Sequence, residues 1–202
     1  MYTTLARDLD LLATFVFALV GARVAADRAL DYGGIAFIAT TAALAGGTLR
    51  NVFLGVRPIW LTNPLFIISV LVAVVITLVF RVIRPIGNFL LIMDTLGLAV
   101  ASVSGTQFAL SHGCSRYAAA ILGLITAVTG GLLRDLLCQV EPVLLHRETI
   151  GTSSLIGSTA YVLLTYSSLS VGYISLIAGA ILCLVRGLSI YFHIDLPKLK
   201  KL

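Results

Sequence analysis

The strongest constraint on the fold is an internal repeat with a constant offset. The segment Ala45-Gly46-Gly47-Thr48-Leu49-Arg50-Asn51 returns as Thr129-Gly130-Gly131-Leu132-Leu133-Arg134-Asp135, 84 positions later (130 minus 46). Other identities occur at the same offset with no gap: Asp10 and Asp94, Val16 and Val100, Gly21 and Gly105, Ala25 and Ala109, Ala36 and Ala120, Ala43 and Ala127, and Pro58 and Pro142. The chain is therefore predicted to be an internal duplication with one further segment at its end.

The composition is that of an integral membrane protein. Hydrophobic residues make up 59% of the 202 residues and charged residues 11%, with a mean hydropathy of +1.05. A soluble domain could not expose so apolar a surface to water. A membrane helix needs about 20 mainly apolar residues. Seven segments are predicted to span: Leu9–Ala26, Gly33–Leu54, Pro64–Phe80, Phe89–Leu110, Tyr117–Cys138, Ile150–Tyr166 and Val171–Phe192.

The basic residues are unequally divided between the two sides of the membrane. With seven spans, the side that holds the N-terminus carries four: Arg7, Arg50, Arg57 and Arg116. The other side carries ten: Arg23, Arg28, Arg81, Arg84, Arg134, Arg147, Arg186, Lys198, Lys200 and Lys201. Because cytoplasmic segments are enriched in Lys and Arg, the C-terminus is predicted to be cytoplasmic and the N-terminus outside. The basic tail, 193–202, is expected to contact anionic lipid headgroups.

Each repeat contains three spans, so the second copy enters the membrane from the opposite side. The predicted fold is a single all-α transmembrane domain over residues 1–202. It comprises two inverted repeats, at about 9–83 and about 89–167, and a seventh helix at about 171–192. Inverted repeats are typical of transport proteins, whose ion or substrate site lies where the two halves meet.

Two glycine pairs occupy equivalent positions in the second and fifth spans. Glycine tolerates unusual dihedral angles, so Gly46-Gly47 and Gly130-Gly131 are expected to bend their helices and present carbonyl oxygens to a polar cavity. Close helix packing through small residues is the alternative. Their symmetric recurrence before an arginine favours a shared pore or gate. The candidate pore and kink residues are Gly46, Gly47, Thr48, Arg50, Asn51, Gly130, Gly131, Arg134 and Asp135.

Arginines within membrane spans are costly and normally face a partner or water. Asp135 directly follows Arg134, but helical neighbours point about 100° apart, so the partners of Arg50 and Arg134 are expected on other helices. Asp10 and Asp94, which begin the first and fourth spans, are the candidate ion-pair or pore-mouth carboxylates. Snorkelling of both arginines to the interface is the alternative.

The positions of Phe15 and Phe17 are occupied by small residues, Ala99 and Ala101, in the other repeat. A phenylalanine at a narrow point can close a pore by excluding water, and Phe15 is the candidate apolar gate. Ordinary core or lipid contact is the alternative for this side chain.

Enzymatic and nucleic-acid functions find no support in the sequence. It contains no nucleophile with a histidine base at a recognisable spacing, no phosphate-binding loop and no metal-ligand spacing. It also has no basic cluster with interleaved aromatic residues, outside the tail, that would bind nucleic acid. We therefore expect no enzyme, no cofactor and no structural metal.

The paired motif in spans two and five of a seven-helix inverted repeat resembles the trimeric intracellular cation channel family. The likeness is to its prokaryotic members, which overlap bacterial proteins labelled putative glycine transporters. The resemblance implies a homotrimer in the prokaryotic cell membrane. Each protomer would hold its own pore, lined by the second and fifth helices and permeable to potassium and, less selectively, to sodium.

This chain departs from the family pattern at three positions. The first motif glycine is Ala45 in one copy and Thr129 in the other, and the final aspartate is Asn51 in the first copy. The charges at the two ends are therefore expected to differ. A secondary carrier for a small solute such as glycine is the alternative function, and a structural subunit whose small residues merely pack is a third.

Overall fold

The computed structural model describes residues 4–80, 87–140 and 150–192. The predicted loop arginines Arg81, Arg84 and Arg147, the end of the first repeat and the basic tail lie outside this part. All described regular structure is helical. The helices are α1 (Thr4–Asp27), α2 (Tyr32–Phe53), α3 (Leu65–Phe80), α4 (Gly87–Ser111), α5 (Arg116–Leu137), α7 (Ile150–Leu164) and α8 (Val171–Tyr191), with a short 3-10 helix, η1 (Ile59–Leu61).

Each predicted segment forms a helix, and most boundaries lie within two residues of the prediction. The exception is α1, which begins at Thr4 rather than Leu9. Five helices, α1, α2, α4, α5 and α8, are long and apolar enough to cross a membrane. The third helix of each repeat is shorter: α3 has 16 residues and α7 has 15. At about 1.5 Å per residue they reach about 24 Å and about 22 Å, less than the roughly 30 Å hydrocarbon core.

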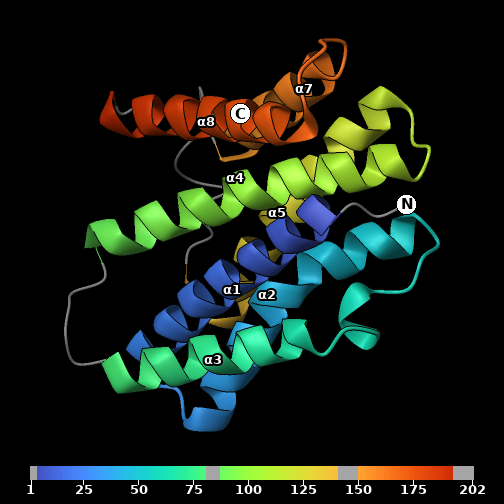
Figure 1. The fold of residues 1–202 in the computed structure, drawn as a ribbon. Coiled ribbons are helices and arrows are strands. Elements are labelled where there is room, and N and C mark those ends of the chain that lie inside the picture. Colours follow the sequence, from blue (N-terminus) through green and yellow to red (C-terminus); the bar gives the residue numbers. More distant parts are fainter. Residues whose placement is uncertain (1–3, 81–86, 141–149, 193–202) are drawn as a thin grey trace, which may run out of the picture.

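The packing follows the duplication. In the first repeat α1 packs on α2 and α3, and in the second α4 packs on α5 and α7. The two repeats meet mainly through contacts between equivalent helices, α1 with α4 and α2 with α5. In Figure 1, α3, α1, α4 and α8 follow one another across the molecule, with α2 and α5 behind them. The two halves thus form one inverted-repeat unit, and α8 is added to its second half through α4 and α7.

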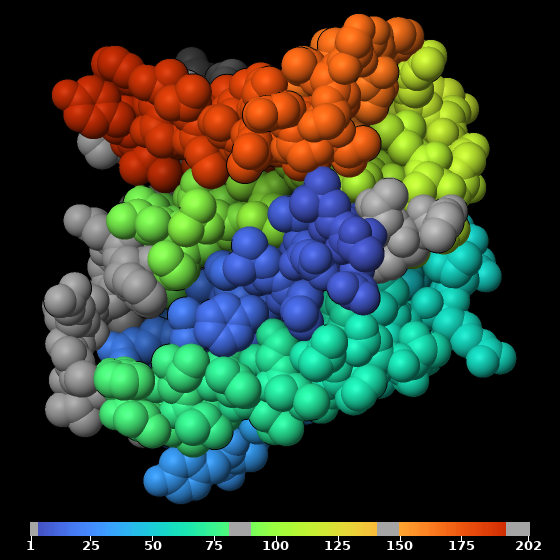
Figure 2. Space-filling view, viewed as in Figure 1, coloured from blue at the N-terminus to red at the C-terminus, as the bar shows by residue number. Residues whose placement is uncertain are grey.

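The core is built on small side chains along α1. Ala18, Ala22 and Ala25 are fully buried, which lets neighbouring helices approach closely. Of the five candidate spans, α1 is the most buried and α8 the least. Figure 2 shows α1 reaching the surface of the molecule between α3 and α4. Exposed apolar side chains cover the outer helices, as expected of a surface that faces lipid: Val72, Val75 and Val79 on α3, and Leu176, Leu184 and Leu188 on α8.

Candidate functional site

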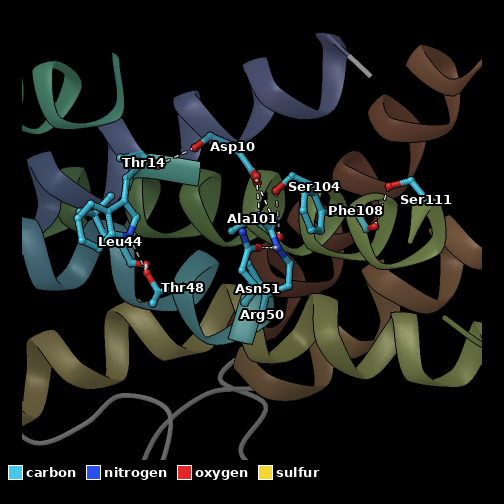
Figure 3. Close-up of polar contacts among 12 residues, drawn as sticks. Asp10, Thr14, Leu44, Thr48, Arg50, Asn51, Ala101, Ser104, Phe108 and Ser111 are labelled. Atoms are coloured by element: carbon cyan, nitrogen blue, oxygen red, sulfur yellow. Dashed lines mark hydrogen bonds and ion pairs between the residues drawn. The ribbon is translucent and has the colours of Figure 1, made fainter. Parts of the chain in front are cut away.

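The first half-site consists of Asp10 on α1 with Arg50 and Asn51 on α2. The Arg50 guanidinium donates from Nη1 to Asp10 Oδ1 at 3.0 Å and from Nη2 to Oδ2 at 2.8 Å, a two-pronged ion pair. Its Nε donates to Asn51 Oδ1 at 3.0 Å. Figure 3 shows the Arg50 and Asp10 side chains directed at each other. Arg50 is 1% exposed, so its charge is buried. The contacts with Asp10 and Asn51 therefore replace the hydrogen bonds that water would make to the guanidinium.

The second repeat completes the environment of Arg50. The guanidinium carbon lies 4.0 Å from the ring centroid of Phe108 on α4, within the range of a cation–π contact. Phe108 in turn stacks on His112 at 4.1 Å. The first half-site is therefore built by helices of both repeats.

The second half-site consists of Asp94 on α4, Arg134 and Asp135 on α5, and Arg186 on α8. Arg134 donates from Nη1 to Asp94 Oδ1 at 2.9 Å and from Nε to Asp135 Oδ1 at 2.8 Å. Arg186 approaches from the other side, with Nη2 3.6 Å from Asp94 Oδ2 and Nε donating to Thr95 Oγ1 at 2.9 Å. Arg134, Asp135 and Arg186 are all buried. The four charged side chains alternate in sign: Asp135, Arg134, Asp94, Arg186.

The prediction that Asp10 and Asp94 are ion-pair partners of the two arginines is confirmed. The ion pairs Arg50–Asp10 and Arg134–Asp94 each span 40 positions. Both arginines have a partner on another helix, as expected, and Arg134 binds the adjacent Asp135 as well. An arginine side chain is long, and its guanidinium carries five N–H donors. Its Nη atoms can therefore bind a residue on another helix while Nε binds the adjacent residue. Snorkelling is excluded by the burial of both arginines.

The first glycine of each pair lies where α2 and α5 cross. A Cβ on Gly46 would overlap the carbonyl oxygen of Thr126, and a Cβ on Gly130 would overlap that of Ala42. These two contacts are equivalent, since 46 and 42 shifted by 84 give 130 and 126. Both helices continue through the glycines without interruption, and the predicted bend stays a prediction. Close backbone packing is the role that the structure gives these two residues.

The second glycine of each pair borders a cavity. The first cavity is lined by Asp10, Thr14, Gly47, Thr48, Arg50 and Trp60, among others, and the second by Asp94, Leu98, Gly131, Arg134 and Asp135. Each cavity is thus lined by the aspartate and arginine that form the shared ion pair of one half-site. A Cβ on Gly47 would come no nearer than 3.9 Å to Arg50 Nη2, and one on Gly131 no nearer than 3.8 Å to Arg134 Nη2.

Phe17 lies between the two cavities and lines both of them. It is 4% exposed, and its equivalent in the second repeat, Ala101, lines the first cavity. The predicted gate residue Phe15 lines neither cavity; it is half-buried and packs against the apolar core. Residues 15 and 17 lie two positions apart on a helix and so point about 200° apart, which the sequence pattern alone did not resolve.

Trp60 in η1 was not singled out in the sequence. Its Nε1 donates to Thr48 Oγ1 at 3.0 Å, and both residues line the first cavity. Asn51 Nδ2 donates to the carbonyl oxygen of Arg57 at 3.0 Å and so ties the connection between α2 and α3 to the same half-site. The position equivalent to Thr48 is Leu132, which cannot accept such a bond.

Comparison with known proteins identifies the fold. A family model described as "Glycine transporter" matches residues 8–82 and 91–166. The UPF0126 membrane protein of Vibrio cholerae is 34% identical over 202 residues, covering 96% of this chain and 83% of that protein. The UPF0126 inner membrane protein YadS of Escherichia coli is 30% identical over 193 residues, covering 94% of this chain and 93% of that protein.

Among solved structures, the crystal structure of the TRIC trimeric intracellular cation channel orthologue from Rhodobacter sphaeroides is 30% identical, with a TM-score of 0.89. The similarity covers 95% of this chain and 100% of that one. The chain belongs to the trimeric intracellular cation channel family. The resemblance predicted from the duplicated arginine motif is confirmed. As a member of this family the chain is an all-helical membrane protein.

Proposed function

We propose that the chain is a monovalent cation channel that conducts potassium and sodium and assembles as a homotrimer with one pathway in each protomer. The observation that carries the proposal is the pair of equivalent cavities on either side of the α2–α5 crossing. Each cavity contains buried carboxylate oxygens beside a guanidinium, and Phe17 lines both. The pathway would run through the two cavities between α1, α2, α4 and α5.

The polar groups along this route suit a cation that has lost part of its water. Asp10, Asp94 and Asp135 supply carboxylate oxygens, and Thr14 and Thr48 supply hydroxyl oxygens. Oxygen ligands and apolar constrictions are the two elements from which cation pathways are built. Phe17 is the apolar constriction of this pathway and takes the role first assigned to Phe15.

We place the protein in the prokaryotic inner membrane with its N-terminus outside. Arg50, Arg134 and Arg186 are buried in ion pairs and do not belong in a count of loop charges. Without them the outer side keeps three basic residues (four minus one) and the inner side eight (ten minus two). The bias therefore survives the correction and supports a cytoplasmic C-terminus.

A secondary carrier for a small solute such as glycine is the second candidate, favoured by the description of the matching family model. The same two cavities would then open alternately to the two sides. A carrier shows saturable flux of a specific solute, whereas a channel shows unitary currents. Recordings of the purified protein in planar bilayers under asymmetric potassium chloride separate the two. Discrete current steps that reverse near the potassium potential support the channel, and silence with saturable glycine uptake into liposomes overturns it.

Gly131→Leu tests the proposed route. The new side chain would enter the second cavity beside Arg134 and Asp94, so we expect conductance to fall several-fold or vanish. Gly179→Leu on α8 is the matched control, because nothing lies within 4 Å of a Cβ at Gly179. Equal currents from the two variants would contradict a pathway through the second cavity.

Phe17→Ala tests the constriction. Removing the ring joins the two cavities, so we expect a larger unitary conductance or a higher open probability than in the unmodified protein. Phe15→Ala is the control, since Phe15 packs against the core instead. An effect of Phe15→Ala that equals or exceeds that of Phe17→Ala would restore Phe15 as the gate.

A further inference from the structure

The first cavity carries hydroxyl groups at positions where the second cavity has leucines. Thr14 on α1 and Thr48 on α2 line the first cavity. Their equivalents in the second repeat (98 minus 14 and 132 minus 48 both give 84) are Leu98 and Leu132, and both line the second cavity. Other equivalent residues line both cavities: Asp10 and Asp94, Gly47 and Gly131, and Arg50 and Arg134. The hydroxyl oxygens of Thr14 and Thr48 therefore distinguish the first cavity from the second.

The hydrogens of these two hydroxyl groups are used within their own helices. Thr14 Oγ1 donates to the carbonyl oxygen of Asp10 at 2.8 Å, and Thr48 Oγ1 donates to that of Leu44 at 2.7 Å (Figure 3). A hydroxyl group has one hydrogen and two lone pairs, so each oxygen can act toward the cavity only as an acceptor. Acceptor oxygens are what a cation requires in place of its water. The two bonds thus hold both oxygens in the form that suits a cation.

The indole of Trp60 fixes the position of the Thr48 hydroxyl. Its Nε1 donates to Thr48 Oγ1 at 3.0 Å, and both residues line the first cavity. An indole N–H is a donor only, so this contact occupies one lone pair of the oxygen and leaves the other. Thr14 is buried, which limits the competition of bulk water for its oxygen. Trp60 is therefore a fluorescent side chain in direct contact with one of the two hydroxyl oxygens.

Thr126 is a further threonine that lines the first cavity, but its hydroxyl group is covered by another helix. Its Oγ1 donates to the carbonyl oxygen of Leu122 at 2.6 Å. The side chain packs against Gly105 of α4, where a Cβ would lie 2.8 Å from Oγ1. We therefore do not count Thr126 among the oxygen ligands of this cavity.

Carboxylates are distributed in the opposite sense. Asp10 lines the first cavity, whereas Asp94 and Asp135 line the second. The first cavity therefore exceeds the second in neutral oxygen atoms and not in carboxylates. A carboxylate attracts any cation from a distance. Hydroxyl oxygens in contact with a cation replace its water, and the gain depends on which ion is present. Discrimination between cations is accordingly expected in the first cavity.

We propose that the first cavity is the selectivity site of the protein, where the hydroxyl oxygens of Thr14 and Thr48 bind a partly dehydrated monovalent cation beside the Asp10 carboxylate. The second cavity, with Leu98 and Leu132 at the equivalent positions, discriminates less between cations. The role in selective conduction rests on the proposed channel function. Binding of the cation does not, and it is measured separately.

The binding experiment follows the fluorescence of the purified protein in detergent while potassium chloride replaces N-methyl-D-glucamine chloride at constant ionic strength. Trp60 is the one tryptophan of the chain, so its emission reports on the first cavity. We expect a saturable change whose half-saturating potassium concentration rises at least several-fold in Thr14→Val, which lacks the hydroxyl oxygen. Thr14→Ser retains that oxygen and should bind as the unmodified protein does.

Thr77→Val on α3 is the matched control for this titration. Thr77 is also buried, and it bonds its own preceding turn at Ala73. This variant should bind potassium as the unmodified protein does. Equal binding by Thr14→Val and the unmodified protein, or no saturable change in the unmodified protein, would overturn the site whether or not the protein conducts.

The conductance experiment measures the reversal potential in planar bilayers with potassium chloride on one side and sodium chloride on the other. Thr14→Val and Thr48→Val should each move the permeability ratio of the two ions several-fold toward one. Leu98→Val, at the position equivalent to Thr14, should shift the ratio less, and Thr77→Val should leave it unchanged.

Two results of this experiment count against the proposal in different ways. An unchanged ratio in both threonine variants, or a shift in Leu98→Val as large as that in Thr14→Val, would overturn the role of the first cavity in selectivity. An absence of current in the unmodified protein would instead overturn the channel function and, with it, that role. The fluorescence result would then still stand as evidence of cation binding in the first cavity.

Discussion

The two half-sites occupy equivalent positions in the two repeats but differ in their charged side chains. The first pairs one aspartate with one arginine and adds an asparagine, whereas the second joins two aspartates and two arginines. The Arg–Asp pair that the half-sites share comes from the duplication, and α8 adds Arg186 to the second half-site. The comparison shows that a helix outside the repeat can add to one half-site an ion-pair contact that the other half-site does not receive from it.

The largest expected effect is a loss of stability, and it tests how far the arginine of each half-site depends on a single carboxylate. Asp10→Asn leaves buried Arg50 without the carboxylate that binds both of its Nη atoms, and we expect a loss of about 3–5 kcal/mol in the free energy of unfolding. Asp135→Asn should cost less, because Arg134 keeps Asp94. Thermal unfolding in detergent measures both. Asp8→Asn is the control, since that side chain is 60% exposed; a larger loss for Asp135→Asn than for Asp10→Asn would break the comparison.

An intermediate effect tests what the two halves have in common. Gly46→Ala and Gly130→Ala each force a methyl group into a backbone carbonyl of the crossing helix, and overpacking of this kind costs about 1–3 kcal/mol. Because the two contacts are equivalent, the two losses should be equal within error. Gly47→Ala and Gly131→Ala, where there is room for a methyl group, are the matched controls. Unequal losses at residues 46 and 130 would show that the crossing is not symmetric.

The smallest expected effect concerns the hydrogen bond between Trp60 and Thr48, which joins two residues that line the first cavity. Thr48→Val removes the acceptor of the Trp60 indole and should cost about 0.5–1.5 kcal/mol. Trp60 is the one tryptophan of the chain, so its fluorescence emission reports the change directly. Thr41→Val on the same helix is the control, because Thr41 bonds its own preceding turn at Phe37. An unchanged emission spectrum in Thr48→Val would contradict this contact.

Much of the fold follows from linear properties of the chain. The constant offset predicted the duplication, and apolar length predicted the helices. The odd number of spans in each repeat predicted the inversion. The cost of a buried arginine then pointed to Asp10 and Asp94 as partners, which is what the structure contains. These inferences need only the period of a helix and the thickness of a membrane, and neither depends on how the helices are rotated against one another.

The tertiary structure decided which side chains meet. Each residue along a helix turns the side chain by about 100°, so the rotation of α1 selects Phe17 rather than Phe15 for the space between the cavities. The close approach of α2 and α5 places Gly46 and Gly130 at the crossing of the two helices. From the sequence, Arg186 was counted only among the basic residues of the C-terminal side, because no sequence pattern relates α8 to Asp94. Its partner is set by the packing of α8 on α4, and that packing lies outside the repeat.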